Sequence, residues 1–261
     1  MGCSAMYKYI QTKEDNGLAW IILNRPEIYN AFNDEMMEEI AQVLKTLEKE
    51  PGVKVIVFKG EGKAFASGAD IESLKKMTPY DALFPKMQEL YQQIYNFPKP
   101  TIAAINGYAL GGGLELAISC DIRICAPNAR FGLPECKLGV IPGAGGTQRL
   151  VRILGEAKVK ELVFLGEFIN AEQALNLGLV SAVVEKSELD QQVEQYAGQI
   201  MQRGPLALRL AKMAINLSED ISLNTGLFIE NLAQSFIFGT EDKKEGVNAF
   251  LEKRLADFNG K

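Results

Sequence analysis

Two glutamates of this chain have surroundings that suit acid–base chemistry, and they lie twenty positions apart. Glu115 follows three glycines in NGYALGGGLELAISCD, and Glu135 lies in the apolar run RFGLPECKLGVIPGAGG. The start of a helix favours an ionised carboxylate, so the position of Glu115 suits a general base. Burial raises a carboxyl pKa, so the surroundings of Glu135 suit a general acid. The pair is a candidate catalytic site, provided that the fold brings the two residues together.

Each glutamate also has a purely structural interpretation. Glu115 can cap its own helix, and Glu135 can pair with Arg130 or Lys137. The residue types alone leave the structural and catalytic interpretations equally open.

The glycines before Glu115 do not match a nucleotide-binding loop. No segment has the GxxxxGK-Ser/Thr pattern, and neither Gly111 to Gly113 nor the run GAGG has GxGxxG spacing. Glycines at a helix start instead let a ligand approach unpaired backbone amides, where each preorganised donor stabilises a developing oxyanion by about 2.7–4 kcal/mol. The alternative is that small residues only permit tight packing of a strand against a helix.

Composition excludes several kinds of chemistry. The 261 residues suffice for one large domain, and they contain no histidine. Ser-His-Asp and Cys-His catalysis, His-ligated zinc and two-His iron sites are therefore excluded. There is no CxxC pair, and we predict no metal site. The formal net charge of −5 argues against nucleic acid as a partner.

The cysteine content and apolar runs favour a cytoplasmic location. The longest apolar run, Thr101 to Leu114, contains Asn106 and is too short to span a bilayer. No secretory apolar segment opens the sequence, and Met6 is a candidate natural start after a short added leader. We expect reduced thiols at all four cysteines, which are Cys3, Cys120, Cys125 and Cys136.

The hydrophobic pattern predicts an α/β fold with parallel strands. We expect a hairpin around Asp15 to Gly17, a helix capped by Asn33 that ends at Pro51, and a helix over 82–95. Apolar strands VKVIVFKG, TIAAIN, DIRICA and LVSAVVE alternate with helices IESLKKM and LELAIS and with the loop EGKAFASGAD. Residues 170–173 predict a capping box. We divide the chain into a core over 1–190 and a helical region over 191–261.

Longer motifs resemble those of a known family. The run IAAINGYALGGGLELAISCDIRI resembles the signature of the crotonase (enoyl-CoA hydratase/isomerase) superfamily, as do AFASGADI before it and ARFGLPECKLGVIPGAGGTQRL after it. The segment TEDKKEGVNAFLEKR resembles the family's C-terminal helix, so the likeness covers nearly the whole chain in the right order. It implies a crotonase-like spiral of ββα units, with the acyl-CoA site in the core and a C-terminal helical region that forms trimers or dimers of trimers.

The resemblance also implies site residues. The thioester oxygen of an acyl-CoA would lie between the amides of Ala69 and Gly112, and no metal or redox cofactor would be needed. Members that hydrate trans-2-enoyl-CoA have both glutamates, which match Glu115 and Glu135. Leu114 and Leu133 replace residues common in hydratases and are candidates for shaping the acyl pocket. Further implied substrate-binding residues are Ala66, Gly68, Asp70, Ile71, Gly111, Pro134, Gly143 and Lys253, the last toward the CoA phosphate of an adjacent subunit.

The expected activity is therefore a short-chain enoyl-CoA hydratase. The alternatives are an enoyl-CoA delta isomerase, in which one glutamate moves the proton, and a noncatalytic acyl-CoA-binding or RNA-binding homologue. A Ser-Lys hydrolase that uses Ser67 or Ser119 is formally possible, but no lysine lies close enough to either serine in the sequence to be a candidate partner. The pathway stays open among fatty-acid β-oxidation, butyrate-type fermentation and aromatic-acid degradation.

Overall fold

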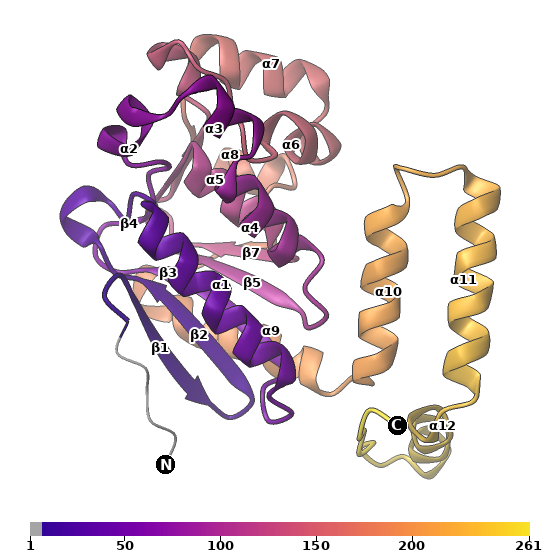
Figure 1. Ribbon diagram of the computed structural model, residues 1–261. Coiled ribbons are helices and arrows are strands. Elements are labelled where there is room, and N and C mark those ends of the chain that lie inside the picture. The colour runs from indigo at the N-terminus through magenta and orange to yellow at the C-terminus, as the bar shows by residue number, and fades with distance from the viewer. Residues whose placement is uncertain (1–6) are drawn as a thin grey trace.

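The computed structural model describes residues 7–261, in which an α/β body is followed by a set of C-terminal helices (Figure 1). Met6, the candidate start, and Cys3 lie outside the described residues.

The body contains a six-stranded sheet. The hairpin is confirmed: Asn16 and Gly17 both have positive φ, at 49° and 84°, as a tight Asn-Gly turn requires. The first two strands are antiparallel, and all other neighbours are parallel. The strands, in spatial order, are β1 (Ile10–Asp15), β2 (Leu18–Leu23), β3 (Val55–Gly60), β5 (Thr101–Ile105), β7 (Ile122–Cys125) and β10 (Ala182–Val183).

A second, four-stranded sheet was not predicted. Its first three strands are parallel, and the fourth is antiparallel to the third. The prediction of a loop over 61–70 is wrong at residues 64–66, because three residues are too few to show an alternating pattern. Since a short strand follows each of β3, β5 and β7, the expected repeat of ββα units is present. The strands, in spatial order, are β4 (Ala64–Ala66), β6 (Tyr108–Leu110), β8 (Arg130–Gly132) and β9 (Ile169–Asn170).

The helices begin largely where capping residues predict. The side chain of Asn33 accepts from the amide of Met36, and Asn170 forms a reciprocal capping box with Gln173. The single helix predicted over 82–95 is wrong, because Pro85 divides it. The α-helices are α1 (Asp34–Lys49), α2 (Ile71–Lys76), α3 (Pro79–Leu83), α4 (Lys86–Tyr95), α5 (Gly112–Ser119), α6 (Gly146–Leu154), α7 (Glu156–Leu165), α8 (Ala171–Asn176), α9 (Leu189–Met201), α10 (Pro205–Leu217), α11 (Leu223–Phe238) and α12 (Glu241–Glu252). The 3-10 turns are η1 (Pro26–Ile28), η2 (Glu135–Leu138) and η3 (Lys186–Glu188).

Hydrophobic clusters cover both faces of the six-stranded sheet. Ile56 and Phe58 belong to a large cluster that also contains the buried face of α1 and the apolar side chains of α5 from Leu114 to Ile118. Val55 and Val57 alternate with them and pack toward Val193 of α9 on the other face. Helix α9 crosses the predicted boundary at residue 190 and covers one face of the sheet of the body.

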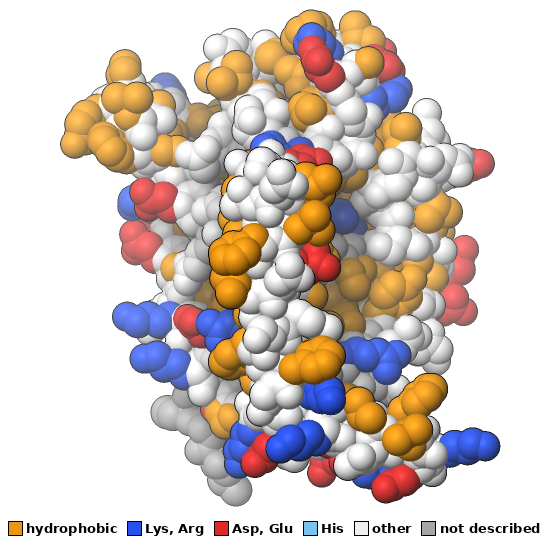
Figure 2. Space-filling view, turned by 90° about the vertical axis from the view of Figure 1, so that its right-hand side faces the viewer, with side chains coloured by type: hydrophobic (Ala, Val, Ile, Leu, Met, Phe, Trp, Pro, Cys, Tyr) orange, Lys and Arg blue, Asp and Glu red, His pale blue; other side chains and the backbone are white. Residues whose placement is uncertain are grey.

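Helices α10 and α11 lie beside the body, and α12 lies at the end farthest from α2 and α3 (Figure 1). Polar contacts join α10 to the body: Lys212 Nζ donates to Asp121 Oδ2 over 2.8 Å, and Asn216 donates to the carbonyl of Tyr95 over 2.9 Å. Apolar side chains lie exposed along the outer face of α11 (Figure 2). The exposed large apolar residues of α11 include Leu223, Leu227, Phe228, Leu232 and Phe236. Within residues 7–261, no helix is long and apolar enough to cross a membrane.

Candidate functional site

The glycines Gly111 to Gly113 form the start of α5, as the sequence predicts, and each has a different structural role. Gly111 is the N-cap with a φ of 53°, a conformation that favours glycine. A Cβ on Gly113 would collide with the carbonyl oxygen of Ala66, so this glycine permits close packing of α5 on β4. Gly112 begins the helix, and its amide donates no hydrogen bond within residues 7–261. The carbonyl of Gly112 accepts from the buried hydroxyl of Tyr91 over 2.8 Å.

A second unpaired amide lies on the neighbouring segment. Phe32 donates to the carbonyl of Gly68 over 2.8 Å and accepts from the amide of Asp70 over 2.9 Å. In this parallel bridge the amide of Ala69, between them, faces away from Phe32 and has no acceptor among the described residues. A Cβ on Gly68, whose φ is 97°, would lie 3.1 Å from the amide nitrogen of Gly112. Residues 68–69 and the start of α5 therefore lie side by side.

Glu115 is almost completely buried, with 2% of its surface exposed. Its Oε1 accepts two hydrogen bonds of 2.8 Å, from the amides of Ala144 and Gly146. Because Gly146 begins α6, this carboxylate lies at the N-terminus of a helix other than its own. Glu115 therefore does not cap α5, and the capping interpretation is wrong.

Two opposing effects act on the pKa of Glu115. Burial raises it, and the amides of Gly146 and Ala144 and the charge of Arg149 act in the lowering direction. Burial outweighs these effects, and the net direction is upward. The donors that favour the ionised form come from α6 and the segment before it.

Glu135 begins the turn η2 and has no charged partner in the part of the chain that is described. Lys137 donates instead to the carbonyl of Gly166, and Arg130 to that of Ala129, so the ion pairs considered above do not form. The buried Oε2 of Glu135 accepts no hydrogen bond from residues 7–261. Burial raises the pKa of Glu135 to about 7, and the charge of Glu115 adds to the rise.

The fold brings Glu135 back to the start of α5. A Cβ on Gly111 would lie 3.0 Å from Glu135 Oε1, so the carboxyl group lies against the N-cap of the helix that carries Glu115. Two unpaired amides and two unequal carboxyl groups thus occupy one region. Such a region can polarise a carbonyl oxygen and transfer protons beside it.

Of the other predicted substrate-binding residues, some border the two glutamates and unpaired amides and others do not. Gly68 and Gly111 border this region directly, as described above. Asp70 caps α2 and pairs with Arg25 over 3.0 Å, and the adjacent Ile71 is 59% exposed. Lys253 ends α12, which lies far from α2 and α5 within the chain (Figure 1).

The remaining predicted residues differ in burial. Ala66 is buried in β4, Pro134 is half-buried before η2, and Gly143 is exposed. Leu114 and Leu133 are completely buried in the large cluster, so they contact no open pocket in this structure. The hydroxyl of Ser119 is also buried and donates to the carbonyl of Glu115, which leaves it no access to a substrate.

Sequence reasoning missed the residues that hold Glu115. Ala144 and Gly146 belong to the second glycine run, and the rule that glycines at a helix start expose amides applies to them equally. Tyr91 gave no signal, because an aromatic residue at helical spacing is ordinary core. Its contact with Gly112 depends on how α4 packs on α5.

Comparisons with known proteins agree with this architecture. Residues 13–261 match the family model described as enoyl-CoA hydratase/isomerase. A crotonyl-CoA hydratase of Syntrophomonas wolfei is 42% identical over 258 residues, which cover 98% of this chain and 99% of that protein. A short-chain-enoyl-CoA hydratase of Clostridium acetobutylicum is 41% identical over 93% of this chain and 94% of its own length. The crystal structure of an enoyl-CoA hydratase from Bacillus anthracis has a TM-score of 0.93 and 38% identity, covering 97% of this chain and all of that one.

The two sheets, the ββα repeat and these matches define one class: the chain belongs to the enoyl-CoA hydratase/isomerase family. The predicted family and the predicted crotonase-like fold are confirmed.

Proposed function

We propose that this protein is an enoyl-CoA hydratase. It adds water reversibly across the double bond of a trans-2-enoyl-CoA and produces a 3-hydroxyacyl-CoA. The observation that carries the proposal is the pair of carboxyl groups in unequal surroundings beside two unpaired amides. The hydratase names of relatives about 40% identical over nearly the whole chain support it.

The amides of Ala69 and Gly112 form the oxyanion hole. When water attacks C3 of the enoyl thioester, negative charge moves to the thioester oxygen. Two fixed donors stabilise this charge without reorganisation, and each is worth about 2.7–4 kcal/mol in the transition state. The sulfur of Met87 packs beside Gly112, since a Cβ there would lie 2.7 Å from Sδ, and it gives this place an apolar wall.

The carboxyl groups divide the proton transfers. Glu115, held by two amide donors, takes a proton from the water that attacks C3. Glu135, whose pKa burial raises to about 7, delivers a proton to C2. All steps use protons and fixed dipoles, so the reaction requires no metal or redox cofactor.

We also infer how the protein assembles, where it acts and which pathway it serves. A homotrimer or a dimer of trimers would cover the exposed apolar face of α11 and would let Lys253 of one subunit reach the CoA phosphate of the next. We infer a cytoplasmic location, in keeping with the free thiols of Cys120, Cys125 and Cys136. Fatty-acid β-oxidation is the pathway class that this reaction serves.

Incubation of the purified protein with crotonyl-CoA and with longer enoyl-CoA thioesters tests the activity. We expect loss of the absorbance of the conjugated enoyl thioester. A parallel incubation with a 3-enoyl-CoA tests the isomerase alternative. Conversion of 3-enoyl-CoA to 2-enoyl-CoA without hydration of 2-enoyl-CoA would identify an isomerase. Absence of turnover at every chain length would overturn the proposal in favour of a noncatalytic homologue.

A further inference from the structure

The segment 142–146 determines where the Glu115 carboxylate points. It supplies both donors to Oε1, from Ala144 and Gly146, and contains Gly145 at a φ of 115°. The carbonyl of Gly145 accepts from the amides of Gln148 and Arg149, which ties the end of the segment to α6. Residues 142–144 lie outside any helix or strand, so their geometry depends on contacts from other parts of the protein.

Arg149 supplies such a contact. This residue lies in the first turns of α6, and its Nη1 donates to the carbonyl of Ala144 over 3.1 Å. The guanidinium also packs against Gly145, where a Cβ would collide with it. The carbonyl that Arg149 holds belongs to the peptide group between Ala144 and Gly145, and this group joins the two residues whose amides bind Glu115. Fixing it restricts how the amides of Ala144 and Gly146 are placed relative to each other.

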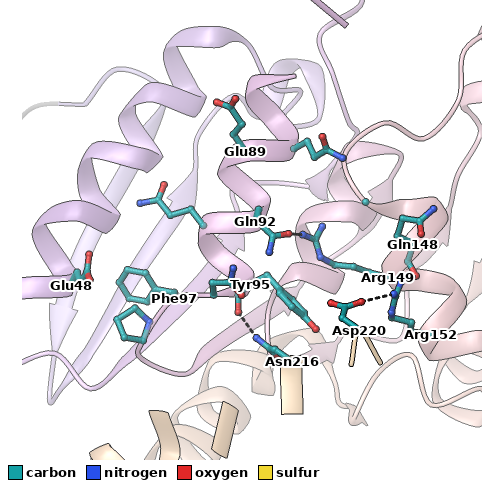
Figure 3. A pocket seen from close by; sticks show the side chains of 15 residues that line it. Glu48, Glu89, Gln92, Tyr95, Phe97, Gln148, Arg149, Arg152, Asn216 and Asp220 are labelled. Atoms are coloured by element: carbon teal, nitrogen blue, oxygen red, sulfur yellow. Dashed lines mark hydrogen bonds and ion pairs between the residues drawn. The ribbon is translucent and has the colours of Figure 1, made fainter. Parts of the chain in front are cut away.

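Helix α4 fixes the guanidinium from the opposite side. Nη2 of Arg149 donates to Gln92 Oε1 over 2.6 Å, and its Cζ lies 5.0 Å from the ring centroid of Tyr95 (Figure 3). These side chains line a cavity of about 770 Å³ between α4, α6 and the end of α10. Since Tyr91 of the same helix binds Gly112, α4 contacts both the start of α5 and the group that supports Glu115.

We propose that Arg149 is a positioning residue for the general base: it holds the carbonyl of Ala144 and thereby fixes the turn that presents the amides of Ala144 and Gly146 to Glu115 Oε1. The catalytic consequence rests on the proposed hydratase function, whereas the effect on Glu115 itself does not.

Arg149 also acts on Glu115 through its charge. The ionisable groups that face Glu115 are Tyr91 of α4, Glu135 of η2 and Arg149 of α6. Arg149 is the cation among them, and its charge lowers the pKa of Glu115. Replacing it with a neutral side chain removes both the hydrogen bond to Ala144 and this charge.

The kinetic test compares Arg149→Met, which keeps much of the volume, with Arg149→Lys, which keeps the charge. Arg152→Met is the matched control, because Arg152 lies on the same helix but pairs with Glu219 and Asp220. We expect Arg149→Met to lower kcat for crotonyl-CoA at least about tenfold with little change in KM, since small misplacements of a catalytic group have large effects. The midpoint of the acid-side fall in kcat should move to higher pH in Arg149→Met, because the pKa of Glu115 rises without the nearby positive charge. Arg149→Lys should return this midpoint to the wild-type value. Arg152→Met should match wild type in both kcat and midpoint.

A second measurement needs no turnover. Wild type, Arg149→Met and Arg152→Met labelled with 13C at the glutamate carboxyl carbon are titrated by NMR, and Glu115→Gln assigns the Glu115 signal. We expect a higher titration midpoint for Glu115 in Arg149→Met alone. An unchanged midpoint together with an unchanged kcat profile in folded Arg149→Met would overturn the inference. A wild-type protein that hydrates no enoyl-CoA would overturn the proposed function, while the NMR comparison would still decide the role of Arg149.

Discussion

Glu115 and Glu135 differ in hydrogen bonding although both are withdrawn from solvent. Oε1 of Glu115 accepts two amide hydrogen bonds of 2.8 Å, whereas Oε2 of Glu135 accepts none from residues 7–261. Amide donors favour a carboxylate, and an apolar site without donors favours the protonated acid. This asymmetry supports the proposed roles of Glu115 as the base and Glu135 as the acid.

Glu115→Gln should abolish proton abstraction without disturbing the fold. Both amide hydrogen bonds end on Oε1, and the glutamine carbonyl oxygen can accept both of them. We expect kcat for crotonyl-CoA to fall by about 10²–10⁴-fold, with a small change in KM and thermal stability. Steady-state kinetics and a melting curve check this. The exposed Glu194 of α9 gives the matched control Glu194→Gln, which should equal wild type. A Glu115→Gln enzyme that kept wild-type kcat would remove this residue from the mechanism.

The pH dependence of kcat/KM should distinguish the two roles. If Glu135 donates a proton, the free enzyme needs it protonated, and its pKa is raised to about 7. We therefore expect kcat/KM for crotonyl-CoA to fall as pH rises through about 7, and to fall again at acid pH as Glu115 gains a proton. The measurement is a pH series of initial rates with enzyme shown to be stable at each pH. A rise through pH 7 to an alkaline plateau would instead assign Glu135 as a base.

Glu135→Gln should make the protein more stable at alkaline pH. Because the pKa of Glu135 is raised from 4.5 to about 7, the folded state favours the neutral acid, and ionisation lowers the free energy of unfolding. The penalty is absent below pH 4.5 and complete above pH 7. The substitution should therefore raise the free energy of unfolding at pH 8.5 by at most about 3 kcal/mol and have little effect near pH 4. Denaturant unfolding at the two pH values measures the difference. An equal effect at both would show that charge is not its cause.

Gly146→Ala should impair the site more than the fold. The added Cβ would lie 3.0 Å from Glu115 Oε1 and 3.0 Å from the Cβ of Pro142, so the carboxylate or the turn must shift. We expect a loss of kcat of about 10²-fold, since displacement of about 1 Å has effects of this size. Gly198→Ala in α9 is the matched control, because a Cβ there meets nothing within 4 Å. It should leave kcat unchanged and stabilise the protein by about 0.5–1 kcal/mol through helix propensity. Equal kinetics for the two variants would contradict the assigned contact.

Local patterns predicted most of the regular structure and missed what has no local pattern. The cap at Asn33, the capping box at Asn170 and the Asn-Gly hairpin each satisfy backbone groups within a few residues, so their signals lie in short segments. The strands β4, β6 and β8 have three residues each, and they exist because parallel neighbours pair with them. Hydrophobic spacing alone also overlooks residues that interrupt a helix. It predicts one helix over 82–95, but Pro85 separates α3 from α4.

The sequence by itself determined which groups are available for chemistry. It has no histidine, it places Glu115 after glycines at a helix start, and it places Glu135 in an apolar segment whose burial raises a carboxyl pKa. Only the tertiary structure decided their partners. The donors to Glu115 come from residues about thirty positions away, and Glu135 lies against Gly111 instead of pairing with Arg130 or Lys137. Spacing along the chain governs contacts within one helix or strand, but contacts between α4, α5 and α6 depend on how their side chains pack together in three dimensions.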